Sequence, residues 1–123
     1  MGKRIMVVDD LRGIQLQMQA VLEGTDYEIV AFCRSGGEAI EKYDEVRPDL
    51  VTMDIVMPGM DGLEAAREIL EKHPGARIII SSSLANEDTI KEAKAIGAKG
   101  FIYKPLEQAR VLEVLDEALQ GKD

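Results

Sequence analysis

Five short apolar runs, rich in Val and Ile, recur along the chain, and a segment with helical spacing follows each of them. Runs of this length without polar alternation are typical of strands that are covered on both faces. The intervening segments place apolar residues three or four positions apart, as one face of a helix requires. We therefore predict strands near 5–8, 28–33, 50–53, 77–81 and 100–103, each followed by a helix.

Start and stop signals support these helices. Ser35, Asp61 and Asn86 can each cap a first turn, and Gly24 and Gly97 fall where a helix should end. Because each crossover between parallel strands must be right-handed and pack back on the sheet, the alternation indicates an α/β fold with helices on both faces of a five-stranded parallel sheet. The expected strand order is the flavodoxin-like order 2-1-3-4-5.

Composition limits what such a domain can do. The chain has 123 residues, of which 46% are hydrophobic, enough for one domain with one conventional core. A formal net charge of −8 argues against nucleic acid or an anionic membrane as a partner, because both require a basic surface. The sequence offers neither a membrane helix nor a signal peptide, so we expect a cytoplasmic monomer whose partners are proteins. Cys33 is the only cysteine, and we expect it to be buried.

Charged residues end three of the predicted strands. Asp9 and Asp10 follow the first, Asp54 the third and Lys104 the fifth. In an open sheet of this order these groups meet at one edge, where ligands bind, and the serines at 81–83 fall between them. A simpler interpretation of the paired aspartates is that one of them caps the helix that begins near Leu11.

The third acid, Asp54, favours a binding site over a helix cap. Two carboxylates about 4 Å apart repel by roughly 4 kcal/mol at an effective dielectric near 20, so a cluster of three requires cations. Lys104 supplies one charge, and a divalent ion would offset the rest. A site that has a small number of oxygen ligands and leaves room for water and a phosphate suits Mg²⁺. A single histidine, His73, and a single cysteine cannot build a zinc site, and His73 is expected at the surface.

Four motifs together resemble the receiver domain of two-component response regulators, with the closest likeness to single-domain, chemotaxis-type members. They are VVDD at 7–10, VTMDIVMPGMDG at 51–62, SSS at 81–83 and GFIYKP at 100–105. The resemblance covers essentially the whole chain, residues 1–123, and implies one response regulatory domain without an output domain. It also implies the strand order given above, which is therefore not an independent result.

The resemblance further implies that Asp54 is the phosphoacceptor, which attacks a phosphohistidine on a sensor histidine kinase. The protein would then be a signalling protein that catalyses only its own phosphorylation and dephosphorylation. Asp10, Asp54 and the backbone carbonyl of Val56 would bind Mg²⁺, with Asp9 helping through water. Lys104 would pair with the phosphoryl group, and the bond to the proline after it is commonly cis in this family.

Two further roles are implied by position in the family motif. The switch hydroxyl lies 22 residues before the lysine, which selects Ser82, and Phe101 matches the aromatic that repositions when that hydroxyl engages phosphate. Phe101 could instead be an ordinary core residue. The positions that tune the lifetime of the phosphate are Val56 and Leu84, both apolar, so we expect a long-lived aspartyl phosphate.

Three other functions share parts of this pattern. A flavin protein would need a hydroxyl-rich phosphate loop and aromatics around the ring, and the chain has no Trp. An aspartate-based phosphohydrolase usually places two acids two positions apart on its first strand, whereas these are adjacent. An interaction module without phosphorylation would not need its acceptor, lysine and hydroxyl intact. The output partner stays open among a flagellar motor switch, another kinase and a phosphorelay protein.

Overall fold

The structure is a computed structural model that describes residues 2–83 and 86–120. Its sheet has the predicted order, β2-β1-β3-β4-β5, and every neighbouring pair is parallel. The strands are β1 (Lys3–Val8), β2 (Tyr27–Cys33), β3 (Leu50–Met53), β4 (Ile78–Ser82) and β5 (Gly100–Tyr103). No helix in the described ranges is long and apolar enough to cross a membrane.

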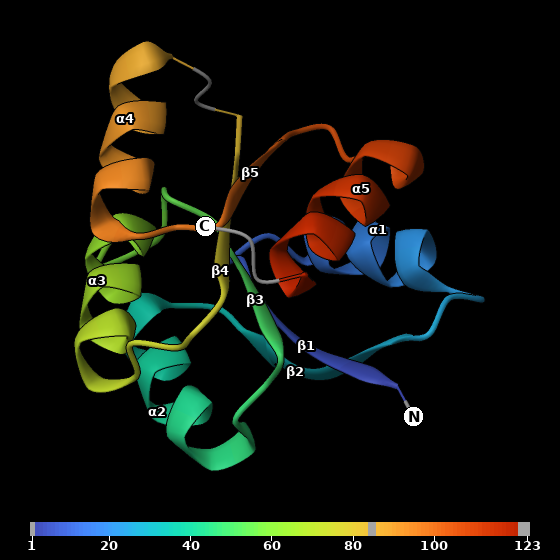
Figure 1. The fold of residues 1–123 in the computed structure, drawn as a ribbon, viewed down its shortest axis with the longest axis horizontal. Coiled ribbons are helices and arrows are strands. Elements are labelled where there is room, and N and C mark those ends of the chain that lie inside the picture. Colours follow the sequence, from blue (N-terminus) through green and yellow to red (C-terminus); the bar gives the residue numbers. More distant parts are fainter. Residues whose placement is uncertain (1, 84–85, 121–123) are drawn as a thin grey trace.

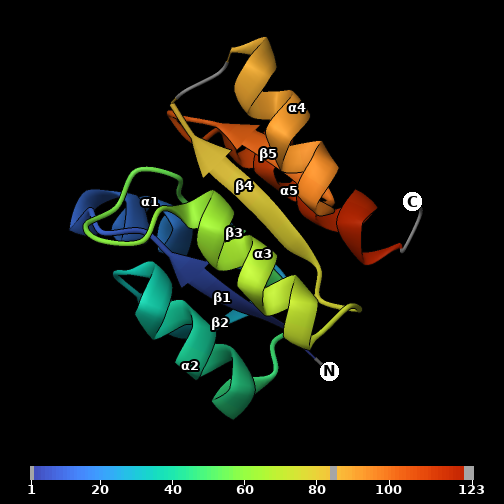
Figure 2. The same ribbon diagram turned by 90° about the vertical axis from the view of Figure 1, so that its left-hand side faces the viewer.

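The helices of the described residues cover the sheet in two layers, as Figures 1 and 2 show. Helices α2, α3 and α4 pack on one face and α1 and α5 on the other. Their bounds are α1 (Arg12–Leu22), α2 (Gly36–Val46), α3 (Gly62–Lys72), α4 (Glu87–Ile96) and α5 (Gln108–Leu119). The predicted fold is confirmed.

The predicted helix signals act as expected. The side chains of Ser35, Asp61 and Asn86 each accept a hydrogen bond from the backbone N–H three residues on, at the starts of α2, α3 and α4. Gly97 ends α4 with a φ of 104°, and Gly24 follows α1 with a φ of 81°. These left-handed conformations are the ones that glycine adopts without a steric penalty.

Side chains along each strand alternate between two separate cores. Ile5, Val7, Leu50, Ile79 and Ile102 face α1 and α5. Their neighbours in sequence, such as Met6, Val51 and Ile80, face α2, α3 and α4. This alternation decides which face of the sheet each residue at the end of a strand occupies.

The expectation that every strand is covered on both faces is wrong for β2. Glu28 is exposed and Phe32 is 38% exposed, whereas Tyr27, Ala31 and Cys33 of the same strand are buried. The reason is position: β2 is an edge strand, and α1 covers it only in part. At the opposite edge of the sheet, Tyr103 of β5 is also 44% exposed.

Candidate functional site

Ladder hydrogen bonds continue one residue past three strands and fix the acids and the lysine at one edge. The N–H of Asp9 donates to the carbonyl of Cys33, and the N–H of Asp54 donates to the carbonyl of Val8, both at 2.9 Å. The N–H of Lys104 donates to the carbonyl of Ser82 at 3.1 Å. The carboxyl ends of β1, β3 and β5 therefore present these three side chains to a common space.

Lys104 joins the two buried carboxylates. Its Nζ lies 2.7 Å from Oδ2 of Asp9 and 3.1 Å from Oδ1 of Asp54, and its side chain is only 11% exposed. Asp9 and Asp54 are 2% and 5% exposed. The Lys104–Pro105 peptide bond is cis, as the family resemblance implies.

The three aspartates form a cluster with one carboxylate oxygen from each within 4.8 Å of the other two. Two of its members are buried, while Asp10 is half-buried and faces solvent in part. Hard oxygen donors at this spacing, with one open side for water and phosphate, fit Mg²⁺ and offer nothing to a soft metal. The donor set therefore fits the ion predicted from the sequence.

Burial dominates the electrostatics of Asp54. It raises the pKa of this carboxyl above its usual value, and the negative charge of Asp9 raises that pKa further. Lys104 acts in the opposite direction through its charge and its hydrogen bond. Within the described residues, Lys104 is the one cation paired with the two buried acids, so the cluster holds an excess of negative charge in the absence of metal.

The interpretation of Asp9 or Asp10 as a helix cap is wrong. The N-cap residue of α1 is Leu11, and no side chain caps this helix. Oδ1 of Asp9 does accept a hydrogen bond from the N–H of Leu11 at 3.0 Å, and its other oxygen bonds Lys104. The carboxylate is thus oriented from both sides while it faces the cluster.

The structure describes three of the four predicted switch and tuning residues. Ser82 ends β4 with 1% exposure, and Phe101 is half-buried in β5, with its ring centroid 5.2 Å from that of Tyr103. Val56 follows Asp54 at the surface and is 62% exposed. Leu84 lies outside the described residues.

His73 lies near the surface, away from the acids. Its Nε2 lies 2.7 Å from Oδ1 of Asp44, and its ring packs on Tyr43 with centroids 4.8 Å apart. It ends α3 and has no part in the cluster.

A requirement that the sequence prediction did not include concerns Gly62. A Cβ at this position would lie 1.7 Å from the backbone oxygen of Asp54, and the N–H of Gly62 donates to the carbonyl of Ile55 at 2.8 Å. The first turn of α3 therefore presses against the backbone that carries the acceptor. The Asp61-Gly62 pair in the sequence was the available signal.

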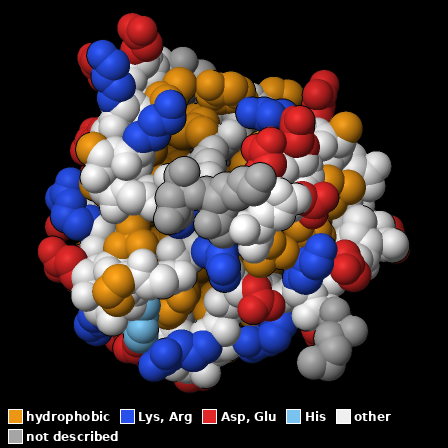
Figure 3. All heavy atoms as spheres, viewed as in Figure 1, with side chains coloured by type: hydrophobic (Ala, Val, Ile, Leu, Met, Phe, Trp, Pro, Cys, Tyr) orange, Lys and Arg blue, Asp and Glu red, His pale blue; other side chains and the backbone are white. Residues whose placement is uncertain are grey.

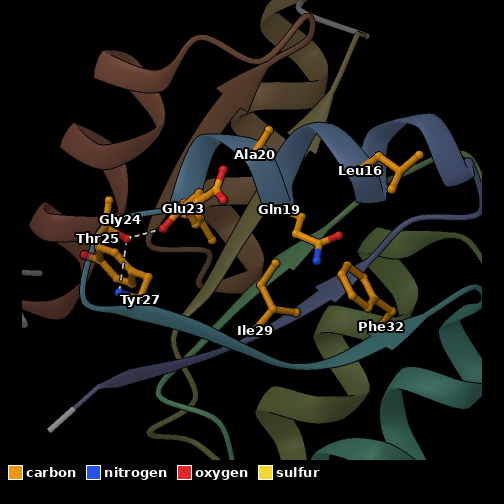
Figure 4. A pocket seen from close by; sticks show the side chains of 10 residues that line it. Leu16, Gln19, Ala20, Glu23, Gly24, Thr25, Tyr27, Ile29 and Phe32 are labelled. Atoms are coloured by element: carbon orange, nitrogen blue, oxygen red, sulfur yellow. Dashed lines mark hydrogen bonds between the residues drawn. The ribbon is translucent and has the colours of Figure 1, made fainter.

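One hollow of the described surface lies away from the acidic cluster. It has a volume of about 560 Å³ and lies between α1 and the edge strand β2, where Figure 4 shows Leu16, Ile29 and Phe32 around it. It contains no cluster of converging charged groups. On the face in Figure 3, Lys and Arg side chains are interspersed with acidic ones and form no basic patch.

Comparison with known proteins agrees with the geometry. Residues 5–116 match the family described as response regulator receiver domain. The chain is 43% identical over 115 residues to the chemotaxis protein CheY of Listeria monocytogenes, covering 94% of this chain and 97% of the relative. Among solved structures, it resembles the response regulator domain of Thermotoga maritima CheB with a TM-score of 0.92 and 32% identity over the full length of both chains.

A second similar chain belongs to a solved complex. CheY in the CheX-CheY-BeF3-Mg²⁺ complex of Borrelia burgdorferi matches with a TM-score of 0.88 and 35% identity, over 91% of this chain and 85% of the other. Family match, full-length relatives and site geometry agree, and none of them favours the flavin protein or the phosphohydrolase. The chain belongs to the response regulator receiver domain family.

Proposed function

We propose that the protein accepts a phosphoryl group on Asp54 from a phosphohistidine of a sensor kinase and thereby switches a docking surface in chemotaxis or a related two-component pathway. The observation that carries this proposal is the pairing of a buried acceptor with a buried ammonium, Lys104 Nζ lying 3.1 Å from Oδ1 of Asp54. The likeness to full-length chemotaxis proteins supports it.

The transfer step needs positioning and charge more than covalent chemistry. A carboxylate oxygen of Asp54 attacks the phosphorus, the P–N bond to the histidine breaks, and the imidazole leaves with the electron pair. Lys104 stays protonated and follows the charge onto the phosphoryl oxygens. A loose phosphoryl-transfer transition state is stabilised chiefly by such fixed positive charge.

Receiver domains bind Mg²⁺ in an acidic pocket, and we propose that Asp9, Asp10, Asp54 and the carbonyl of Val56 hold the ion here. Bound Mg²⁺ would supply positive charge beside the phosphoryl oxygens. The spacing of the three carboxylates, within 4.8 Å, supports this ligand set. Asp9 has one oxygen committed to Lys104, which is consistent with its holding the ion through water.

The output would pass through α4, β5 and α5. Ser82 and Phe101 are the proposed switch: the hydroxyl engages phosphate and the ring repositions. A hollow of about 110 Å³ beside Phe101, lined by residues of α4 and β5 that include Ile90 and Ala93, provides room for such a movement. Phosphate would then bias an equilibrium between two packings of this surface.

Phosphotransfer from candidate histidine kinases tests the proposal. We expect label to move from the kinase histidine to the wild type only with Mg²⁺ and not to an Asp54→Asn variant. The phosphorylated form should then capture a protein partner that the unphosphorylated form does not. Label on another residue, or wild type that remains unlabelled by every kinase and by acetyl phosphate, refutes the proposal and favours an interaction module.

The lifetime of the phosphate is a separate expectation. Val56 and Leu84 have no group that could orient an attacking water, so the aspartyl phosphate should be long-lived. Because Val56 is exposed beside the acceptor, a polar side chain there can reach the solvent side of the phosphoryl group. A double variant, Val56→Asn with Leu84→Gln, should shorten the half-life measured after removal of the phosphodonor. Equal half-lives contradict the expectation.

A further inference from the structure

The hydroxyl of Ser81 is buried and lacks a hydrogen-bond partner. The residue is 3% exposed, and its Oγ is the only buried side-chain nitrogen or oxygen within residues 2–83 and 86–120 without a partner. A buried hydroxyl with no partner costs free energy, so its presence needs a reason. The position of Ser81 relative to Asp54 and Lys104 provides one.

Strand register places Ser81 beside the acceptor. Met53 of β3 pairs with Ile80 of β4, so the next residues, Asp54 and Ser81, are neighbours across these strands. Side chains alternate along a strand, and Ile79 faces α1 and α5. Ser81, two residues on, therefore faces the same side.

Asp54 and Lys104 lie on that side as well. Leu50 and Ile102 belong to the core beneath α1 and α5. Asp54 lies four residues after Leu50 and Lys104 two residues after Ile102, and ladder hydrogen bonds extend both strands to these residues, so the alternation places both side chains on the same face. By the same count Ser82 faces the opposite side, toward α3 and α4. The two consecutive serines thus serve different faces of the sheet.

The side chain of Lys104 must cross β4 to reach its partners. It starts on β5 and its ammonium contacts Asp54 after β3 and Asp9 after β1, and β4 lies between β5 and β3. Ser81 is the buried hydroxyl of β4 on the face over which it crosses. Serine is a small residue for this position, and its oxygen is without a partner among the described residues.

The contacts among the described residues leave one N–H donor of Lys104 unused. An ammonium carries three N–H donors, and the carboxylates of Asp9 and Asp54 take two. When Asp54 carries phosphate as an acyl phosphate, its carboxyl group is no longer an anion, and the ammonium of Lys104 turns toward the phosphoryl oxygens. The hydroxyl of Ser81 is then the neutral acceptor that can fix the direction of that turn.

We propose that Ser81 is a positioning residue that accepts a hydrogen bond from Lys104 when the acceptor carries phosphate. The inference rests on phosphorylation of Asp54 as proposed above and adds a residue on the face opposite the switch serine. Its role is distinct from the switch role that is proposed for Ser82.

Two matched pairs of proteins separate the effect of the hydroxyl group from the effect of side-chain volume. Ser81 and Ser81→Ala differ by the oxygen, and Ser81→Thr and Ser81→Val differ by hydroxyl against methyl at nearly the same shape. The rate constant for phosphorylation at saturating acetyl phosphate and Mg²⁺ should be about tenfold higher for the hydroxyl member of each pair, the effect of a hydrogen bond to a charged group. The dissociation constant for Mg²⁺, measured by calorimetry, should be equal within pairs.

A second readout does not depend on turnover. In protein loaded with Mg²⁺ and beryllofluoride, a phosphoryl mimic, the ¹⁵N ammonium signal of Lys104 should be protected from exchange with solvent in the hydroxyl variants and lost in the other two. Removing an unpaired buried hydroxyl should also raise the Tm of metal-free Ser81→Ala, so misfolding will not mask the result.

Equal phosphorylation rate constants for the two members of either pair overturn the inference. A loss of rate that is explained by a weaker affinity for Mg²⁺ overturns it as well. If wild type accepts phosphate and Ser81→Ala accepts it at the same rate, this inference is refuted and the proposed function is not. Wild type that accepts none refutes the proposed function, and with it the role of Ser81.

Discussion

Removing the charge of Asp10 should stabilise the metal-free protein. The Asp10→Asn change keeps the shape of the side chain and deletes one of three carboxylates whose oxygens lie within 4.8 Å. At that distance two unit charges repel by about 3.5 kcal/mol at an effective dielectric of 20 and by about 0.9 kcal/mol in water. Asp10 contacts two such partners but is half-buried, so its interactions fall toward the lower value.

We therefore expect a gain of about 2 kcal/mol in the free energy of unfolding, which in a domain of this size corresponds to about 8 °C in Tm. The assay is thermal unfolding in EDTA at neutral pH and low salt. Mg²⁺ should raise the Tm of wild type, because the ion binds only the folded state, and should raise that of Asp10→Asn much less. Phosphorylation of the variant from a kinase or acetyl phosphate should be abolished.

Glu41→Gln is the matched control, since Glu41 is exposed on α2 and the change alters net charge equally. It should leave the metal-free Tm nearly unchanged. A lower Tm for Asp10→Asn in EDTA refutes the account of the cluster. An equal gain in Glu41→Gln would assign the effect to net charge and refute it as well.

Three other outcomes can be checked on the purified protein. Because burial raises the pKa of Asp54, the folded carboxyl keeps its proton where the unfolded one has lost it, so this contribution to stability is full at low pH and is lost as pH rises through the folded pKa. Metal-free Asp54→Asn should therefore match wild type below about pH 4 and become increasingly more stable above it, and a difference independent of pH would contradict this. Gly62→Ala should lower stability by about 3 kcal/mol in urea unfolding, because its Cβ would lie 1.7 Å from a backbone oxygen, whereas Gly13→Ala, with open space, should not. Burial raises the pKa of Cys33 to about 12, so a thiol reagent should label it only at the rate of unfolding, and fast labelling of native protein would contradict its placement.

Local sequence signals were sufficient for most of the fold. Apolar runs and capping residues such as Ser35 and Asn86 act over a few positions, so their effects can be predicted without knowledge of the tertiary structure. The exposure of Phe32 could not be predicted in this way. A run of apolar residues looks alike in an edge strand and in a central one, and only the order of strands in the sheet distinguishes them.

The same distinction applies to the site. Asp9, Asp54 and Lys104 come together because three strands end at one edge of the sheet. The apolar runs located these strands, and the family resemblance implied their order. The missing partner of Ser81 could not be predicted, because it depends on side-chain contacts across neighbouring strands. The three consecutive serines look equivalent in the sequence, and the sheet makes them different.

The alternation of side chains along β4 gives the hydroxyls of its last two residues, Ser81 and Ser82, different neighbours. Its pairing with β3 places Ser81 on the side of the acceptor and Ser82 on the side of α3 and α4. An insertion or deletion of a single residue ahead of them would exchange the two environments without altering the composition of the strand. The length of chain from the start of β4, rather than the chemistry of either serine, therefore determines which hydroxyl lies on the face of Asp54 and Lys104 and which lies on the face of α3 and α4.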